Sequence, residues 1–161
     1  MELEGSMSWD ELLNSSAEVG QLLLESGAEI YRVEESILRI CRAYGVSDCQ
    51  VFAIPSLIIV SAADAQGHNH TKIRRLSERS TDLARVGFLN DLCRRICRDR
   101  PEYHRVQTQL SQVRSLPIYP LWVKILAAGV ASLGFTLLFG GSWLDGLGAG
   151  VCGLVLQPVR T

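Results

Sequence analysis

The chain has 161 residues, a net charge of −1 and 47% hydrophobic residues. This length allows one compact domain, or one soluble domain with a membrane hairpin. The near-zero total hides an asymmetry, because residues 1–69 carry a net charge of −8, residues 70–116 carry +6 and residues 117–161 carry +1. Five cysteines without the spacing of a disulfide framework indicate reduced thiols in a cytoplasmic domain.

The first 45 residues predict two helices. Ser8 followed by Glu11 forms the capping-box pattern that begins a helix. Gly27 is suited to the left-handed turn that ends one, and a second helix should follow over about residues 28–44. Apolar residues recur at helical spacing along both segments, which predicts one buried face on each. The expected buried residues are Leu12, Val19, Leu22 and Leu23, then Ile30, Val33, Ile37, Ile40, Cys41 and Tyr44.

Between residues 50 and 76 the pattern is typical of β-strands. Segments 50–54, 57–63 and 71–76 are rich in Val, Ile and Phe or alternate apolar with polar residues. Pro55 separates the first two segments and marks a bend or an edge, and residues 64–69 form a turn. We expect three short strands in a meander.

Helical spacing returns at about residue 81. One helix should run to about Asp99, and another should restart with Pro101 in its first turn, where proline is tolerated. The residues expected on the buried sides are Leu83, Val86, Leu89, Asn90, Cys93, Ile96 and Cys97, then Tyr103, Val106, Leu110 and Val113. Residues 8–116 are therefore predicted to form an α+β domain of about four helices and a small three-stranded sheet, followed by a stiff hinge at residues 116–120.

Residues 121–139 form one apolar stretch with a single charge, Lys124. A helix of about twenty residues crosses a hydrocarbon core of ~30 Å, and this short chain offers little core to bury such a helix. We predict a membrane span here and a second, truncated span at residues 143–157. Small residues let helix backbones approach closely in lipid. Gly146, Ala149, Gly150 and Gly153 are expected to face Ala127, Ala131 and Gly134.

The basic block at residues 70–116 lies directly before this apolar stretch. Arg and Lys concentrate on the cytoplasmic side of membrane spans, so the soluble part should face the cytoplasm. The arginines fall on amphipathic helices with few interleaved aromatic residues. The sequence therefore favours a membrane flank over a nucleic-acid-binding surface.

Two groups of residues have spacings that could hold a metal. Cys93 and Cys97 are one helical turn apart, and Asp64 lies close in sequence to His68 and His70. Helical cysteine pairs on an apolar face more often pack in a core, and loop histidines are usually solvated. No metal site and no cofactor is predicted.

A set of short motifs runs through the chain in order. They are Gly27 with Tyr31-Arg32-Val33-Glu34, Phe52 with Pro55, residues 71–75, Asp82 with Leu83 and Asn90, and residues 138–143 with Asp145. Together they resemble the threonine/serine exporter family over most of residues 8–157. The resemblance implies a cytoplasmic α+β domain followed by a helical membrane domain. It also implies substrate-binding or other functional roles for Gly27, Arg32, Glu34, Pro55, Asp82, Asn90 and Asp145.

The same resemblance implies the function and the partners. Members are implicated in threonine and serine export as multi-pass proteins of the cell (inner) membrane, and related two-component systems pair a long protein with a small membrane partner for dicarboxylate export. We expect an amino acid or dicarboxylate as substrate, the membrane and further copies of the chain as partners, and no nucleic acid. The family continues through further spans where this chain stops, so a fragment or truncated product is expected. Two helices alone cannot enclose a polar pathway.

Two alternatives stay open. The soluble part could be a membrane-tethered, hydrolase-like domain acting on small metabolites, or a non-catalytic regulatory or oligomerisation domain. Ser56 is the candidate nucleophile, but no base can be identified for it, so no catalytic residue is predicted. The sequence favours a transporter component over an enzyme.

Overall fold

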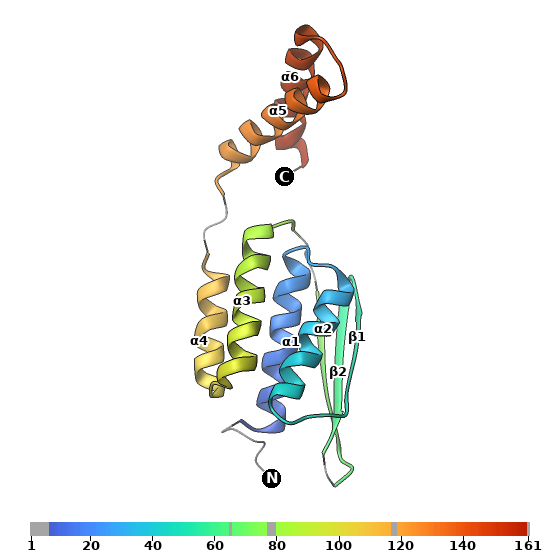
Figure 1. Ribbon diagram of the computed structural model, residues 1–161, viewed down its shortest axis with the longest axis vertical. Coiled ribbons are helices and arrows are strands. Elements are labelled where there is room, and N and C mark those ends of the chain that lie inside the picture. Colours follow the sequence, from blue (N-terminus) through green and yellow to red (C-terminus); the bar gives the residue numbers. More distant parts are fainter. Residues whose placement is uncertain (1–6, 65, 77–79, 117–118, 161) are drawn as a thin grey trace. The chain divides into compact units, whose positions relative to one another are not determined.

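The computed structural model describes residues 7–64, 66–76, 80–116 and 119–160. The described residues form six helices and one three-stranded sheet, which confirms the α+β class (Figure 1). In chain order the elements are α1 (Trp9–Glu25), α2 (Ile30–Ala43), β1 (Cys49–Ile54), β2 (Leu57–Ala63), β3 (Asn69–Arg75), α3 (Leu83–Asp99), α4 (Tyr103–Arg114), α5 (Leu121–Leu138) and α6 (Trp143–Arg160). The chain divides into two compact units, Met1–Leu116 and Pro117–Thr161, and each is described by itself.

Helix α1 is the central element of the first unit. Its start is the predicted capping box, in which the Ser8 backbone N–H donates to Glu11 Oε2 at 2.8 Å and Glu11 N–H donates to Ser8 Oγ at 3.3 Å. Buried residues occur around most of its circumference, beyond the predicted stripe, and they include Leu13, Ala17 and Leu24. The reason is that α1 packs against α2, the sheet, α3 and α4 at once.

The sheet is an antiparallel meander of order β1-β2-β3, as expected. Its inner face is covered by α1 and α2 and includes the fully buried Ile58 and Val60. The outer face leaves Phe52 and Ile73 more than half exposed. Strand β3 begins at Asn69, two residues before the expected start, because the pairing with β2 extends to Ala63 opposite Asn69.

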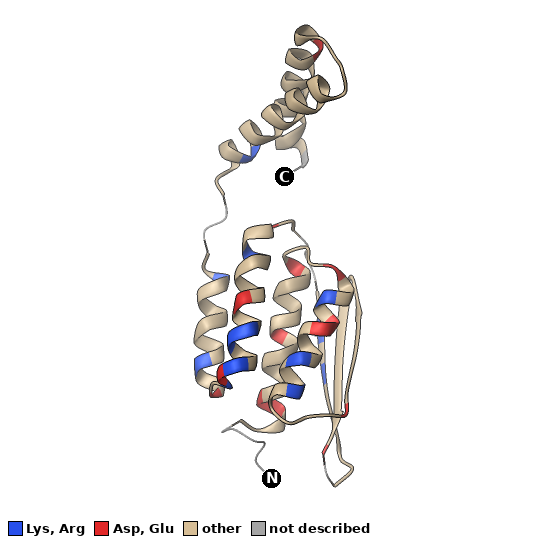
Figure 2. Cartoon of the chain, viewed as in Figure 1, with Lys and Arg blue, Asp and Glu red and all other residues tan. Residues whose placement is uncertain are grey.

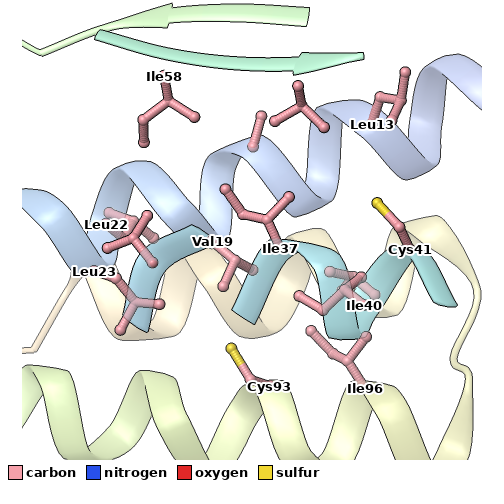
Figure 3. Close-up of a cluster of buried hydrophobic side chains, with 14 of the residues drawn as sticks. Leu13, Val19, Leu22, Leu23, Ile37, Ile40, Cys41, Ile58, Cys93 and Ile96 are labelled. Carbon is pink, nitrogen blue, oxygen red and sulfur yellow. The ribbon is translucent and has the colours of Figure 1, made fainter. Parts of the chain in front are cut away.

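Helices α1 and α2 form a layer between the sheet and the pair α3 and α4 (Figure 1). Figure 3 shows the core that results, with Val19 and Ile37 between α1 and α2, Ile58 from the sheet on one side, and Cys93 and Ile96 from α3 on the other. The expected buried faces of α2 and α4 are confirmed: all their predicted residues are buried or packed against the core.

Two predictions about α3 and α4 are wrong. Leu83 is 74% exposed, and the fully buried Leu92 takes a place in the core instead. At about 100° per residue, Leu83 points roughly 120° away from Leu89, so the two cannot share a face. Pro101 precedes α4 rather than opening it, because Arg100 ends α3 in the left-handed conformation (φ 43°) and Glu102 is the residue before the first helical one. Of the expected hinge, residues 117–118 lie outside the described part.

The second unit is a hairpin of α5 and α6 joined by a turn at Gly140, whose φ is +86°. Three glycines of α6 face α5 as expected, namely Gly146, Gly150 and Gly153, and a side-chain carbon added at Gly153 would lie 2.8 Å from the Ala128 carbonyl oxygen. The expected partners on α5 are wrong. Ala127, Ala131 and Gly134 are exposed, and the packed stripe is formed by Gly129, Ser132 and Leu133 on another side of the helix.

Helix α5 is long and apolar enough to cross a membrane, and among the described residues it is the one helix that meets this criterion. The apolar part of α6, Trp143–Val159, is shorter. Helix α6 continues through Pro158 to Arg160, past the expected end at residue 157. Proline has no backbone N–H and its ring crowds the carbonyl four residues earlier, but near the end of the helix this affects the last turn alone.

Candidate functional site

Gly27 and Asp82 meet at a junction between the end of α1 and the start of α3. Gly27 has a φ of +92°, and a side-chain carbon added there would lie 2.8 Å from the Ser80 carbonyl oxygen. The Asp82 backbone N–H donates to the Ser26 carbonyl at 2.9 Å, and Asp82 Oδ1 accepts from the Arg85 backbone N–H at 3.0 Å, which caps α3. The structure thus brings two of the seven candidate residues together, and their contacts there hold elements in place.

Glu34 lies on the side of α2 that faces the sheet. Its Oε1 accepts a hydrogen bond of 2.9 Å from the backbone N–H of Ala53 in β1. Strand β1 is an edge strand, so this carboxylate satisfies a donor that β2 does not reach and connects α2 to the sheet. Arg32, two residues earlier in the chain, pairs with Glu29 and not with Glu34.

Arg32 is exposed at the start of α2. Its guanidinium lies 3.4 Å from Glu29 Oε2, donates to the Tyr31 hydroxyl at 3.2 Å, and sits 5.9 Å from the centre of the Tyr31 ring. The hydrogen bond with Tyr31, with help from Glu29, raises the pKa of Arg32. More than half of the side chain remains accessible, so its donors can also reach a ligand.

Arg32 and Asn90 line one groove between α2 and α3, which has a volume of about 840 Å³. We refer to it as the α2–α3 groove. Its rim carries five arginines, three from α2 and two from α3: Arg32, Arg39, Arg42, Arg94 and Arg98. Its floor consists of small side chains, namely Ser36, Ala43, Cys93 and Cys97. Basic positions on both helices are visible in Figure 2.

Four of the five rim arginines are paired with nearby carboxylates. Arg39 lies 2.7 Å from Glu35, which is four residues earlier on α2. Arg94 lies 3.0 Å from Asp91, and Arg98 lies 2.7 Å from Asp99. Each of these pairs is exposed on both sides, and exposed pairs contribute only about 0–1 kcal/mol to stability. Arg42 has no acidic partner among the residues that the structure describes.

The residues of both units match one known family, described as "Putative threonine/serine exporter", over residues 15–161. The chain belongs to the threonine/serine exporter family. A curated relative from Mycobacterium tuberculosis, named "Probable threonine/serine exporter", is 29% identical over 136 residues, which cover 83% of this chain and 26% of the relative. The chain thus spans about a quarter of that relative's length. No solved structure matches it.

In this member of the threonine/serine exporter family, two further candidate residues are not part of the groove lining. Pro55 sits in the tight turn between β1 and β2. Asp145 belongs to the hairpin unit, where its Oδ2 accepts from the Ser142 backbone N–H at 3.0 Å and from the Ser142 hydroxyl at 2.8 Å. This arrangement caps the start of α6. Of the seven candidates, Arg32 and Asn90 are the pair that lines the α2–α3 groove.

The cysteines of the α+β unit are free thiols in or near the core. Burial raises the pKa of Cys93 to about 12 and also raises that of Cys97. A hydrogen bond with Cys49, together with burial, raises the pKa of Cys41, and the same hydrogen bond lowers the pKa of Cys49. The two groove cysteines are therefore neutral thiols at physiological pH.

Asp64, His68 and His70 do come together at the β2–β3 turn. Asp64 Oδ2 lies 3.2 Å from His68 Nδ1 and 3.4 Å from His70 Nε2, and Trp9 stacks on His70 with 5.3 Å between ring centres. Over the described ranges, no group of three or more His, Cys, Asp or Glu side chains could hold a metal ion. The cluster supports the turn, since Asp64 Oδ1 also accepts backbone N–H groups of Gln66 and His68.

Sequence patterns did not single out Arg39, Arg42, Arg94 and Arg98 as one group. The α2 arginines fit the helix dipole, and the α3 arginines fit a basic membrane flank, so each had a local explanation. The signal that could have grouped them is their helical spacing beside small residues on both helices, because small facing residues leave space between packed helices.

Proposed function

We propose that this chain supplies the N-terminal domain and first membrane hairpin of an exporter of small amino acids, with threonine and serine as substrates. The observation that carries the proposal is the family match, which runs through both the α+β unit and the hairpin. Since the matched part is about a quarter of the named relative, further helices must complete the transport pathway. They would come from additional spans, further copies of this chain or a small membrane partner.

The surface of the hairpin supports a place in the membrane. Large apolar side chains point outward all along α5 and α6, among them Val130 (71% exposed), Leu138 (76%) and Leu144 (80%). Water does not favour such a surface, whereas lipid or neighbouring helices would cover it. The hairpin also carries few charged residues (Figure 2). The basic residues ahead of α5 and the lack of Lys and Arg in the α5–α6 turn support a cytoplasmic location of the α+β unit.

Arg32 is the residue best suited to hold the substrate carboxylate. A guanidinium donates two parallel N–H groups to the two oxygens of a carboxylate, a group that every amino acid and dicarboxylate presents. Its exposed pair with Glu29 is weak enough to be exchanged for a ligand. Asn90 offers an amide from α3 on the other side of the same groove. Glu34 is held by Ala53 and serves the position of α2.

The test is threonine and serine efflux from preloaded cells that produce the full exporter containing these residues. Arg32→Lys should reduce efflux about tenfold or more, because lysine keeps the positive charge but lacks the two parallel N–H donors of the guanidinium. Expression and thermal stability should stay unchanged, since the side chain is exposed. The matched control Arg95→Lys changes an exposed arginine on α3 outside the groove and should transport normally.

Three outcomes would contradict parts of this proposal. Full efflux with Arg32→Ala would show that Arg32 is not part of the substrate site. A large loss of thermal stability with Arg32→Lys makes it a structural residue. If the same cells export dicarboxylates but neither threonine nor serine, the substrates are dicarboxylates and not amino acids.

A further inference from the structure

We propose that the α2–α3 groove binds a linear oligophosphate, either free or as part of a nucleotide. This ligand differs in chemical class from the exported amino acid and would compete with it for Arg32, which lies at one end of the groove. Its binding can be measured whether or not the chain takes part in export. The inference rests on the shape of the groove, the surplus of positive charge at its rim and the spacing of its arginines.

The groove is a hollow of a size that suits a small molecule. Its floor is made of short side chains from both helices, with Ser36 and Ala43 on α2 and Cys93 and Cys97 on α3. Short side chains on both partners keep the two helix surfaces from filling the space between them. The volume of about 840 Å³ lies within the range of small-molecule sites, about 300–1,000 Å³.

The charge of the lining favours an anion with several charges. Five arginines and one glutamate, Glu35, line the groove, which gives a net charge of +4. With Glu29, Asp91 and Asp99 counted as partners of rim arginines, the net charge is +1, but these exposed pairs contribute little to stability and can be exchanged for a ligand. A zwitterionic amino acid has no net charge, so it would leave this surplus uncompensated. An oligophosphate compensates it and presents oxygens that guanidinium groups bind in pairs.

The spacing of the arginines favours an extended ligand over a compact one. At about 1.5 Å rise per residue, Arg32, Arg39 and Arg42 extend over about 15 Å of α2, and Arg94 and Arg98 over about 6 Å of α3. Two carboxylates of a short diacid are too close together to reach both ends of this row. A chain of phosphates places one charged group after another along it. Tyr31, 60% exposed at the end where Arg32 lies, offers an aromatic surface on which a nucleotide base could stack.

The first experiment is calorimetric titration of the full chain, reconstituted in phosphatidylcholine nanodiscs, with inorganic tripolyphosphate. We expect saturable binding that weakens as the salt concentration rises. Arg94→Gln combined with Arg98→Gln should weaken it at least tenfold. The matched control Arg95→Gln removes an exposed arginine from the same helix outside the groove and should bind as the unchanged protein does.

Further titrations identify the source of the phosphate. Tighter binding of ATP than of tripolyphosphate assigns a nucleotide, and equal binding assigns free oligophosphate. Absence of saturable binding overturns the proposal, as does an equal loss with Arg95→Gln, which would show a diffuse charge effect. It is also overturned if citrate or threonine binds as tightly as tripolyphosphate, or if binding appears only in nanodiscs containing phosphatidylglycerol.

A second experiment locates the ligand. Cys97 lies half-buried in the groove floor, whereas Cys49 lies half-buried on β1 outside it. Tripolyphosphate should slow the alkylation of Cys97 by a maleimide at least threefold, followed residue by residue with mass spectrometry, and should leave the rate at Cys49 unchanged. If the alkylation rate of Cys97 is the same with and without saturating tripolyphosphate, the ligand binds elsewhere and the assignment to this groove is overturned.

Discussion

Gly27 illustrates a residue whose type is set by its backbone. Its φ of +92° is costly for any residue with a side chain, and an added carbon would lie 2.8 Å from the Ser80 carbonyl oxygen. Gly27→Ala should therefore destabilise the protein by at least about 1–3 kcal/mol. Thermal unfolding of the two proteins in detergent measures this loss. The control Gly87→Ala, in a helix position with open space, should be neutral or stabilise by up to about 1 kcal/mol.

Glu34 is a candidate site residue whose observed contact is structural. Its carboxylate accepts the backbone N–H of the buried Ala53, so Glu34→Ala leaves that donor without a partner and should cost about 1–3 kcal/mol. Glu34→Gln keeps an acceptor oxygen and should lose less than half as much. Chemical unfolding of both variants distinguishes the two roles of the residue. Equal losses would mean that the negative charge itself, and not the acceptor, is required.

Asp64 makes the stability of the β2–β3 turn dependent on pH. Burial opposes its ionisation, but hydrogen bonds from His68 and His70 outweigh this and lower its pKa to about 2 from an ordinary 3.8. A lowered folded-state pKa means that the stabilisation is fully present above about pH 4 and is lost as the pH falls from 3.8 towards 2. Asp64→Asn should be less stable at pH 6, and the difference should narrow towards pH 2, measured by urea unfolding. A difference that is constant with pH would exclude the charge as its cause.

At the scale of elements, the α5–α6 hairpin depends on the close approach of two backbones. A side-chain carbon at Gly153 would lie 2.8 Å from the Ala128 carbonyl oxygen, whereas one at Gly148 would meet open space. Gly153→Leu should therefore separate the helices, and Gly148→Leu should not.

Disulfide cross-linking reports this separation. An added carbon at Gly150 would lie 3.5 Å from Leu133 Cβ, within the range that a disulfide requires. Cysteines placed at these two positions, with Cys152→Ala to avoid side reactions, should cross-link readily and keep doing so with Gly148→Leu. With Gly153→Leu the yield should fall at least threefold. An unchanged yield would mean that this contact does not hold the hairpin together.

The elements that the sequence predicted well are those governed by local chemistry. The Ser8–Glu11 capping box, the turn at Gly27 and the strand at residues 57–63 depend on neighbours in the chain, and all three are present. The choice of faces was less predictable. Leu83 was assigned to a buried stripe that it does not join, and the small residues of α5 occur around the whole helix, so their spacing could not show which side packs.

The groove was the least predictable feature. Its arginines come from segments about fifty residues apart in the chain, and each follows from a local rule about helix ends or membrane flanks. Only the packing of α2 beside α3 brings Arg39 and Arg94 to one hollow. The family resemblance singled out Arg32 and Asn90, but it did not indicate that both residues line the same groove.

At the scale of the whole molecule, the two units differ in what surrounds them. The α+β unit buries its apolar residues in its own core, whereas the hairpin turns most of its apolar surface outward. The basic residues just before α5 include Arg105 and Arg114, and the α5–α6 turn at residues 139–142 contains no Lys or Arg. Because positive residues are retained in the cytoplasm, α5 should insert with its N-terminal end inside.

Reporter fusions measure this orientation. Green fluorescent protein, which fluoresces only in the cytoplasm, and alkaline phosphatase, which is active only outside it, are joined in separate fusions after Leu116, after Ser142 and after Thr161. We expect fluorescence after Leu116 and phosphatase activity after Ser142. If α6 returns through the membrane, the fusion after Thr161 should fluoresce as well. Its apolar part of 17 residues gives about 26 Å of helix, close to but below the ~30 Å of a hydrocarbon core. The same sidedness after Leu116 and Ser142 would contradict the crossing of α5, and phosphatase activity after Thr161 would limit the crossing to that one helix.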